Sequence, residues 1–163
     1  MIPFDDPRWT RLRCALGCQC NQRELIRSIS DGAITTDVWD MAFNHIVYQD
    51  EIDELSLAAG PYQVDAIERS TKLRWEPLSL LAATEIATTN RVDFPSDLLS
   101  DFKTAFSRIP NLLAKHCDRS WDELVTRCAT SCIALACGHR GLAKIYLECS
   151  YDDLCRCRET LEQ

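Results

Sequence analysis

Apolar residues recur every three or four positions along most of this chain, and strict alternation of apolar and polar residues is nearly absent. Spacing of three and four places apolar side chains on one face of an α-helix, whereas alternation indicates a strand. Residues 38–47 carry a wide apolar stripe of this kind. Residues 77–87 are apolar nearly all round, so we expect that helix to lie at the centre of the core. The pattern predicts an all-α protein.

Glycine and proline divide this pattern into about eight or nine helices. Pro7 and Pro77 suit the first turn of a helix, and Gly32 suits a helix end. Gly60-Pro61 lies within an otherwise helical stretch, where we expect it to kink or interrupt the helix.

Capping chemistry predicts further helix boundaries. Thr36 or Asp37 is expected to cap the helix over 38–47. Ser120 begins a capping-box pattern for another helix, because a glutamate follows it three residues later. A last helix is expected after Ser150, where a similar capping pattern occurs.

Length and composition fit a single globular domain over residues 1–163. An apolar fraction of 46% and a charged fraction of 26% argue against disorder. The short connections predict antiparallel neighbours, which leaves two arrangements open: stacked hairpins, as in α-solenoids, or a closed helical bundle. No leader segment opens the chain and no apolar stretch reaches about 18 residues, so we expect a cytoplasmic protein with no membrane partner.

Negative charge is concentrated in one part of the chain. Between Ser28 and Glu68 there are nine carboxylates and no lysine or arginine, whereas the remaining residues are nearly balanced. A surface of one sign speeds the encounter with an oppositely charged partner, at some cost in stability. We therefore expect a protein partner with a basic surface. Nucleic acid is not an expected partner, because no cluster of basic residues is present to bind its phosphates.

The candidate partner-binding residues are carboxylates of this window, with one tyrosine as an aromatic anchor. Trp39 and Phe43 are expected to lie in the core instead. The alternative interpretation is a solvated face that only maintains solubility. A bound cation is not expected, because the glycine and ligand spacing of an EF-hand are absent. The candidates are Asp37, Asp40, Tyr48, Asp50, Glu51, Asp53, Glu54, Asp65 and Glu68.

Ten cysteines fall into two groups, at positions 14–20 and 117–157. Without an export signal, reduced thiols are expected rather than disulfides. Cys128 and Cys132 lie four residues apart among apolar neighbours, where cysteine acts as a small apolar side chain. The C-terminal group leaves open an alternative function as a zinc- or thiol-dependent regulator, although no Cys-x2-Cys pair occurs.

No motif for catalysis or cofactor binding occurs in the chain. A Gly-rich phosphate loop, a Gly-x-Ser-x-Gly elbow and a His-Glu-x-x-His pair are all missing from the sequence. A nucleophilic Cys-His pair stays open, because sequence does not show spatial contacts. We expect a non-catalytic protein with no cofactor and no metal site.

Several short segments of the chain form, in order, a recognisable pattern. They are Val38-Trp39-Asp40, Ile46-Val47-Tyr48, Ala58 to Val64, Pro77 to Ile86, Phe94 to Leu98, and the pair Ile133 to Ala136 and His139 to Ala143. In this order the segments resemble small bacterial helical proteins of the HEAT-like type. The resemblance implies an α-solenoid built from stacked antiparallel hairpins. Proteins of this kind are often immunity proteins that neutralise secreted bacterial toxins.

The chain departs from that family at the end of the tryptophan-containing helix. Phe43-Asn44-His45 stands where the family has His-Gln-Gly, and about five additional residues, 49–53, follow Tyr48. These additional residues are rich in carboxylates, which can mimic phosphates and pair with arginine. Resemblance and charge together predict an immunity protein that occludes a basic toxin domain with an acidic surface.

Overall fold

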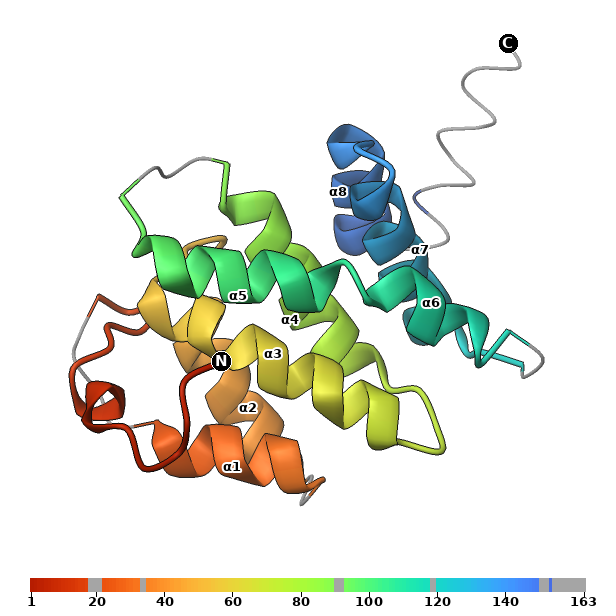
Figure 1. Ribbon diagram of the computed structural model, residues 1–163. Coiled ribbons are helices and arrows are strands. Elements are labelled where there is room, and N and C mark those ends of the chain that lie inside the picture. The colour runs from red at the N-terminus through yellow and green to blue at the C-terminus, as the bar shows by residue number, and fades with distance from the viewer. Residues whose placement is uncertain (18–21, 33–34, 90–92, 118–119, 150–152, 154–163) are drawn as a thin grey trace, which may run out of the picture.

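The computed structural model describes residues 1–17, 22–32, 35–89, 93–117, 120–149 and 153. This part of the chain is all-helical, as the apolar spacing predicts (Figure 1). One β-bridge, between Tyr48 and Glu51, lies between two helices. The elements are a short 3-10 helix η1 (Pro7–Thr10) and the helices α1 (Arg23–Asp31), α2 (Thr36–His45), α3 (Glu54–Arg69), α4 (Trp75–Ala87), α5 (Ser96–Phe106), α6 (Ile109–Ala114), α7 (Glu123–Ala136) and α8 (Arg140–Glu148).

Helix α3 lies at the centre of the arrangement. It packs against α1, α4, α5 and α6, while α4 in turn packs against α7 and α8 (Figure 1). Neighbours in sequence also pair, α1 with α2, α3 with α4 and α7 with α8. Such pairings occur in stacked hairpins and in closed bundles, the two arrangements that the sequence leaves open.

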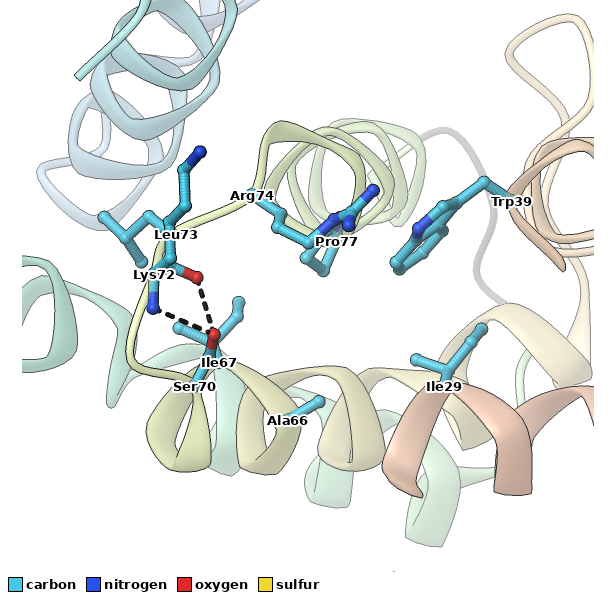
Figure 2. Close-up of a pocket in the computed structure, with 9 residues that line it drawn as sticks. All are labelled: Ile29, Trp39, Ala66, Ile67, Ser70, Lys72, Leu73, Arg74 and Pro77. Carbon is cyan, nitrogen blue, oxygen red and sulfur yellow. Dashed lines mark hydrogen bonds between the residues drawn. The ribbon is translucent and has the colours of Figure 1, made fainter. Parts of the chain in front are cut away.

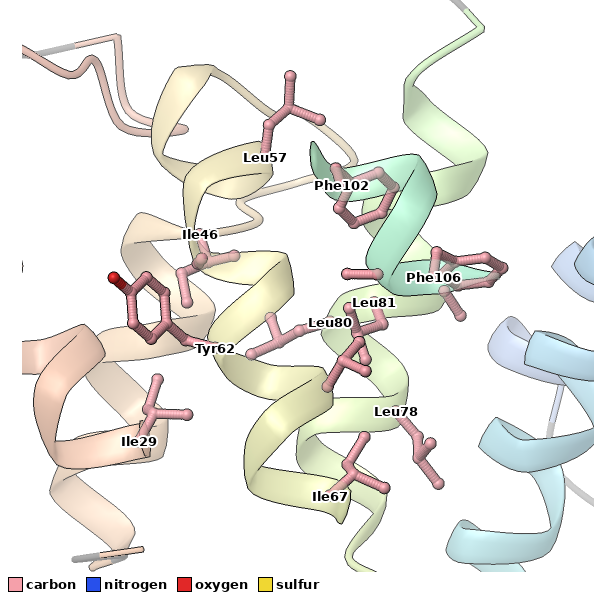
Figure 3. Packing of buried hydrophobic residues seen from close by; sticks show 14 of the residues in the cluster. Ile29, Ile46, Leu57, Tyr62, Ile67, Leu78, Leu80, Leu81, Phe102 and Phe106 are labelled. Carbon is pink, nitrogen blue, oxygen red and sulfur yellow. The ribbon is translucent and has the colours of Figure 1, made fainter. Parts of the chain in front are cut away.

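The part of the core drawn in Figure 3 lies around α3, α4 and α5, and α1, α2, α6 and α7 also contribute buried apolar residues. Leu78, Leu80 and Leu81 of α4 are fully buried, which confirms that this nearly all-apolar helix is central. Phe102 of α5 is also fully buried and lies beside α3. In the described part of the chain, no helix is both long enough and apolar enough to cross a lipid bilayer.

Helix α3 runs without interruption through Gly60-Pro61, so of the two expected outcomes, a kink or an interruption, the interruption was wrong. Proline removes one backbone hydrogen bond and crowds the preceding turn. Eleven of the sixteen residues of α3 are buried, and the packing of so much surface offsets that loss. A capping box between Asp53 and Ser56 further stabilises the start of the helix.

Several predicted helix boundaries are shifted. Thr35, and not Thr36 or Asp37, caps α2 by accepting a hydrogen bond from the backbone of Val38. Asp122, and not Ser120, caps α7. The end of α1 is as predicted, because Gly32 adopts the left-handed conformation with a φ of 73°. The helix expected after Ser150 lies outside the described residues.

Candidate functional site

Two carboxylates of the acidic window are held by Arg13, which lies outside it. The Nη2 atom of Arg13 lies 3.3 Å from Oδ1 of Asp53 and 3.7 Å from Oε1 of Glu54. Asp53 is buried, and its side chain accepts a hydrogen bond from the backbone of Glu54 at the start of α3. These two acidic groups therefore stabilise the fold and are not free for a partner.

Two further carboxylates, on α3, meet basic residues from the α5–α6 region. Arg108 donates through Nη1 to Oδ1 of Asp65 at 2.9 Å and also forms an ion pair with Glu68. Lys115 lies 3.7 Å from the second oxygen of Glu68. The hydrogen bond to Asp65 is the main reason why the pKa of Arg108 is raised. Asp65 and Glu68 thus link α3 to the residues at the two ends of α6, Arg108 before it and Lys115 after it.

Of the five carboxylates of the window that remain, Asp31 lies at the end of α1, and the other four belong to α2 and the turn that follows it. Asp37 and Asp40 are exposed on α2, and Asp50 and Glu51 are exposed in the turn that follows it. None of the four forms an ion pair with any residue that the structure describes. Apart from Asp31 at the end of α1, the uncompensated charge of the window therefore lies on α2 and its following turn.

This turn has an unusual backbone. Tyr48 and Glu51 exchange both backbone hydrogen bonds, at 3.1 and 2.9 Å, and so close a two-residue loop. The two loop residues, Gln49 and Asp50, have φ values of 50° and 66°. A two-residue loop with both φ values positive is the type I′ turn, which favours Asn-Gly because other side chains are strained there. Ile52, which is buried, anchors the chain directly after the turn.

Two exposed apolar side chains belong to the same segment. Met41 on α2 is 45% exposed and Tyr48 is 37% exposed. Met41 follows Asp40 and lies outside the apolar stripe of α2. This position on the polar side of the helix is the sequence signal that could have identified Met41 as exposed. We call Asp37, Asp40, Met41, Tyr48, Asp50 and Glu51 the α2 acidic face.

The aromatic residues of α2 point inward, as expected. Trp39 is buried, with 4% of its surface exposed. Phe43 is half-buried and stacks on Trp75 of α4, with ring centroids 5.5 Å apart. One side of α2 therefore contributes to the core and the other forms the acidic face.

The cysteines of α7 are buried. Burial raises the pKa of the Cys128 thiol to about 11 and raises that of Cys132 further. The sulfur of Cys132 lies 3.5 Å from the backbone oxygen of Leu78. Both side chains therefore stay as thiols at neutral pH, which makes them poor nucleophiles and poor metal ligands.

The other cysteines of the proposed regulatory group are spread out. Cys117 and Cys137 are exposed and Cys149 is half-buried, while Cys155 and Cys157 lie outside the described residues. Within the described ranges, no three histidine, cysteine or carboxylate side chains come together in a way that could hold a metal ion. The zinc- or thiol-dependent regulator stays an alternative prediction.

Comparisons with models of protein families, with curated proteins and with solved structures find no match to this chain. The HEAT-like immunity-protein resemblance therefore stays a prediction. The geometry of the α2 acidic face is the main basis for a functional proposal.

Proposed function

We propose that this protein is a non-catalytic binding module that recognises a basic surface on a protein partner through the α2 acidic face. The observation that carries the proposal is the group of four exposed carboxylates that have no ion-pair partner among the described residues. In line with the resemblance, the partner we propose is a cognate bacterial toxin domain, which the binding module neutralises by covering its basic surface.

The combination of charge and apolar surface supports this proposal. Carboxylates around an interface accelerate association and select the partner, whereas affinity comes mainly from a few buried anchors. Met41 and Tyr48 are exposed in the same segment as the four carboxylates and could supply such anchors.

The conformation of the turn also supports a binding role. Left-handed backbone at residues other than glycine is costly, and such strain is concentrated at functional sites. Gln49 and Asp50 both adopt it, and the turn presents Tyr48, Asp50 and Glu51 on the surface. The strained turn therefore fixes the geometry of half of the proposed binding surface before the partner arrives.

The proposal can be tested by comparing charge-reversed variants in capture from the native host. The binding variant carries Asp37→Lys, Asp40→Lys, Asp50→Lys and Glu51→Lys, and the partner retained by the unaltered protein is identified by mass spectrometry. We expect the association rate constant of the variant with that partner, at low salt, to be at least about tenfold lower than that of the unaltered protein. Stopped-flow fluorescence measures this rate constant. For the unaltered protein, it should also fall as the salt concentration rises.

A matched control reverses four carboxylates on other surfaces, at Asp5, Glu24, Asp101 and Glu148, so that the net charge changes equally. This control should keep most of the association rate. A partner that binds the α2 variant as fast as the unaltered protein would refute the proposed surface. Equal slowing in both variants would show that net charge, and not this face, drives the encounter.

A further inference from the structure

A small apolar hollow opens where the first four α-helices meet (Figure 2). Its enclosed part measures about 30 Å³, two to three times the space that one ordered water needs. The wall is almost entirely apolar. The lining includes Ile29 of α1, Trp39 of α2, Ala66 of α3, Arg74 before α4 and Pro77 of α4.

A buried donor faces this hollow without a partner. The indole Nε1 of Trp39 is buried and forms no hydrogen bond with any described residue. In Figure 2 the indole ring points into the space toward Arg74 and Pro77. The indole N–H groups of Trp9 and Trp121, in contrast, each donate a hydrogen bond to a backbone oxygen. A buried polar group without a partner is costly, so the Trp39 donor calls for an acceptor.

A positive charge stands at the mouth of the hollow. The guanidinium carbon of Arg74 lies 6.0 Å from the centroid of the Trp39 ring. Nε and Nη2 of Arg74 donate to the carboxylate of Glu76, at 3.3 and 2.6 Å. A guanidinium group has five N–H donors, so donors remain on Arg74 for a further acceptor.

Among the described residues, no lining side chain accepts a hydrogen bond from the Trp39 donor. The hydroxyl of Ser70 donates to the backbone oxygen of Lys72 at 2.6 Å and accepts from the backbone N–H of Lys72 at 3.2 Å. A ligand that fits must therefore bring an acceptor, preferably an anionic one, together with a small apolar body.

From this geometry we infer that the hollow binds a carboxylate that carries a short branched aliphatic group. The aliphatic group fills the apolar space against Ile29, Ala66 and Pro77. The carboxylate lies between the Trp39 indole and Arg74 and accepts from both. Charge-assisted hydrogen bonds of this kind are about twice as strong as neutral ones, so the carboxylate should be strongly preferred over its amide. This site is separate from the α2 acidic face, and the inference does not rest on the proposed function.

Isobutyrate is a suitable probe, followed by the indole N–H signals in a ¹H,¹⁵N correlation spectrum of the full chain. Trp39→Phe assigns the relevant signal by removing it. We expect millimolar isobutyrate to shift the Trp39 signal in a saturable way, while isobutyramide, its neutral analogue, leaves the signal in place. Arg74→Gln should weaken binding about tenfold, as expected for loss of one charge-assisted hydrogen bond. The control Lys144→Gln, on α8, should bind normally.

Two results would overturn the inference. One is a Trp39 signal that isobutyrate does not move, and the other is an equal shift with isobutyramide. Ala66→Leu provides a second check, because it fills the hollow and leaves the indole donor in place; it should abolish the shift. If Ala66→Leu is folded by thermal unfolding and still responds to isobutyrate, the ligand binds elsewhere. Asp50→Lys with Glu51→Lys should not change isobutyrate binding, which separates this test from that of the α2 acidic face.

Discussion

The ring of Phe102 lies where a side chain at position 60 would begin. A Cβ atom added to Gly60 would lie 2.8 Å from Cε2 of Phe102 and still closer to Cδ2. Gly60 therefore allows α3 and α5 to approach closely at the centre of the core, where Phe102 is fully buried. Glycine here serves packing and does not mark a helix end.

Gly60→Ala should consequently destabilise the protein. Overpacking a core costs about 1–3 kcal/mol, and the gain of up to about 1 kcal/mol in helix propensity offsets only part of it. We expect a net loss of about 1–2 kcal/mol in the free energy of unfolding, measured by urea titration. The control is Gly141→Ala in α8, where no atom lies within 4 Å of the added Cβ. That variant should be neutral or slightly stabilised; equal losses in the two variants would contradict the packing explanation.

Removal of the Asp53 side chain should be far more damaging than removal of Asp37. Asp53 is buried, completes the capping box of α3 and pairs with Arg13, whereas Asp37 is exposed. Loss of such a cap costs about 1–2 kcal/mol, and a surface change stays within about 0.5 kcal/mol. Thermal unfolding of Asp53→Ala and Asp37→Ala compares the two. Similar stabilities would show that Asp53 does not hold the start of α3.

Alkaline pH should destabilise the fold through Cys128. Its folded pKa of about 11 exceeds the ordinary thiol value of 9.0, so the folded state holds the proton more tightly than the unfolded state. The resulting stability is complete below about pH 9 and is lost as pH rises toward 11. Between about pH 8 and 10.5, the free energy of unfolding should fall by roughly 1–2 kcal/mol more in the unaltered protein than in Cys128→Ala.

Chemical denaturation at several pH values measures this difference. Lysines and tyrosines titrate in the same range, but they are common to both proteins and cancel in the comparison. Cys137→Ala is the matched control, because Cys137 is exposed. Parallel pH curves for Cys128→Ala and the unaltered protein would show that burial of this thiol does not contribute.

The type I′ turn after α2 should be improved by Asn-Gly. Gln49→Asn with Asp50→Gly places the preferred residues at two positions with positive φ, so we expect a gain of about 1 kcal/mol in the free energy of unfolding. The change also removes one carboxylate of the α2 acidic face, and Asp50→Asn, which removes only that charge, is the control. No gain in stability over the control would mean that the native turn is not strained.

The helical pattern could be predicted from the sequence because it depends on local spacing. Periodicity was sufficient to predict the central position of α4, and Gly32 was sufficient to predict the end of α1. Helix caps were predicted less well. Asp122 and Ser120 are both residue types that favour the N-cap position, and only the backbone conformation shows that Asp122 accepts the capping hydrogen bond, from Val125. The uninterrupted course of α3 depends on tertiary packing, which local propensity does not include.

Ion pairing in the acidic window could not be predicted for a similar reason. Arg108 is 43 residues from Asp65 in sequence, and Arg13 is 40 residues from Asp53. Only the fold brings these charges together. The sequence therefore overestimates the free negative charge of the window, and the structure leaves most of it on α2 and the following turn.

The same long-range pairs affect the unfolded chain. Without Arg13 and Arg108 nearby, residues 28–68 form a stretch of like charge that self-repulsion keeps extended. Folding brings the basic side chains to α3 and removes part of this repulsion. The repulsion among the carboxylates of residues 28–68 is therefore weaker in the folded state than in the unfolded state. Added salt screens the repulsion in the unfolded ensemble and makes it more compact, which should lower the denaturant dependence of unfolding.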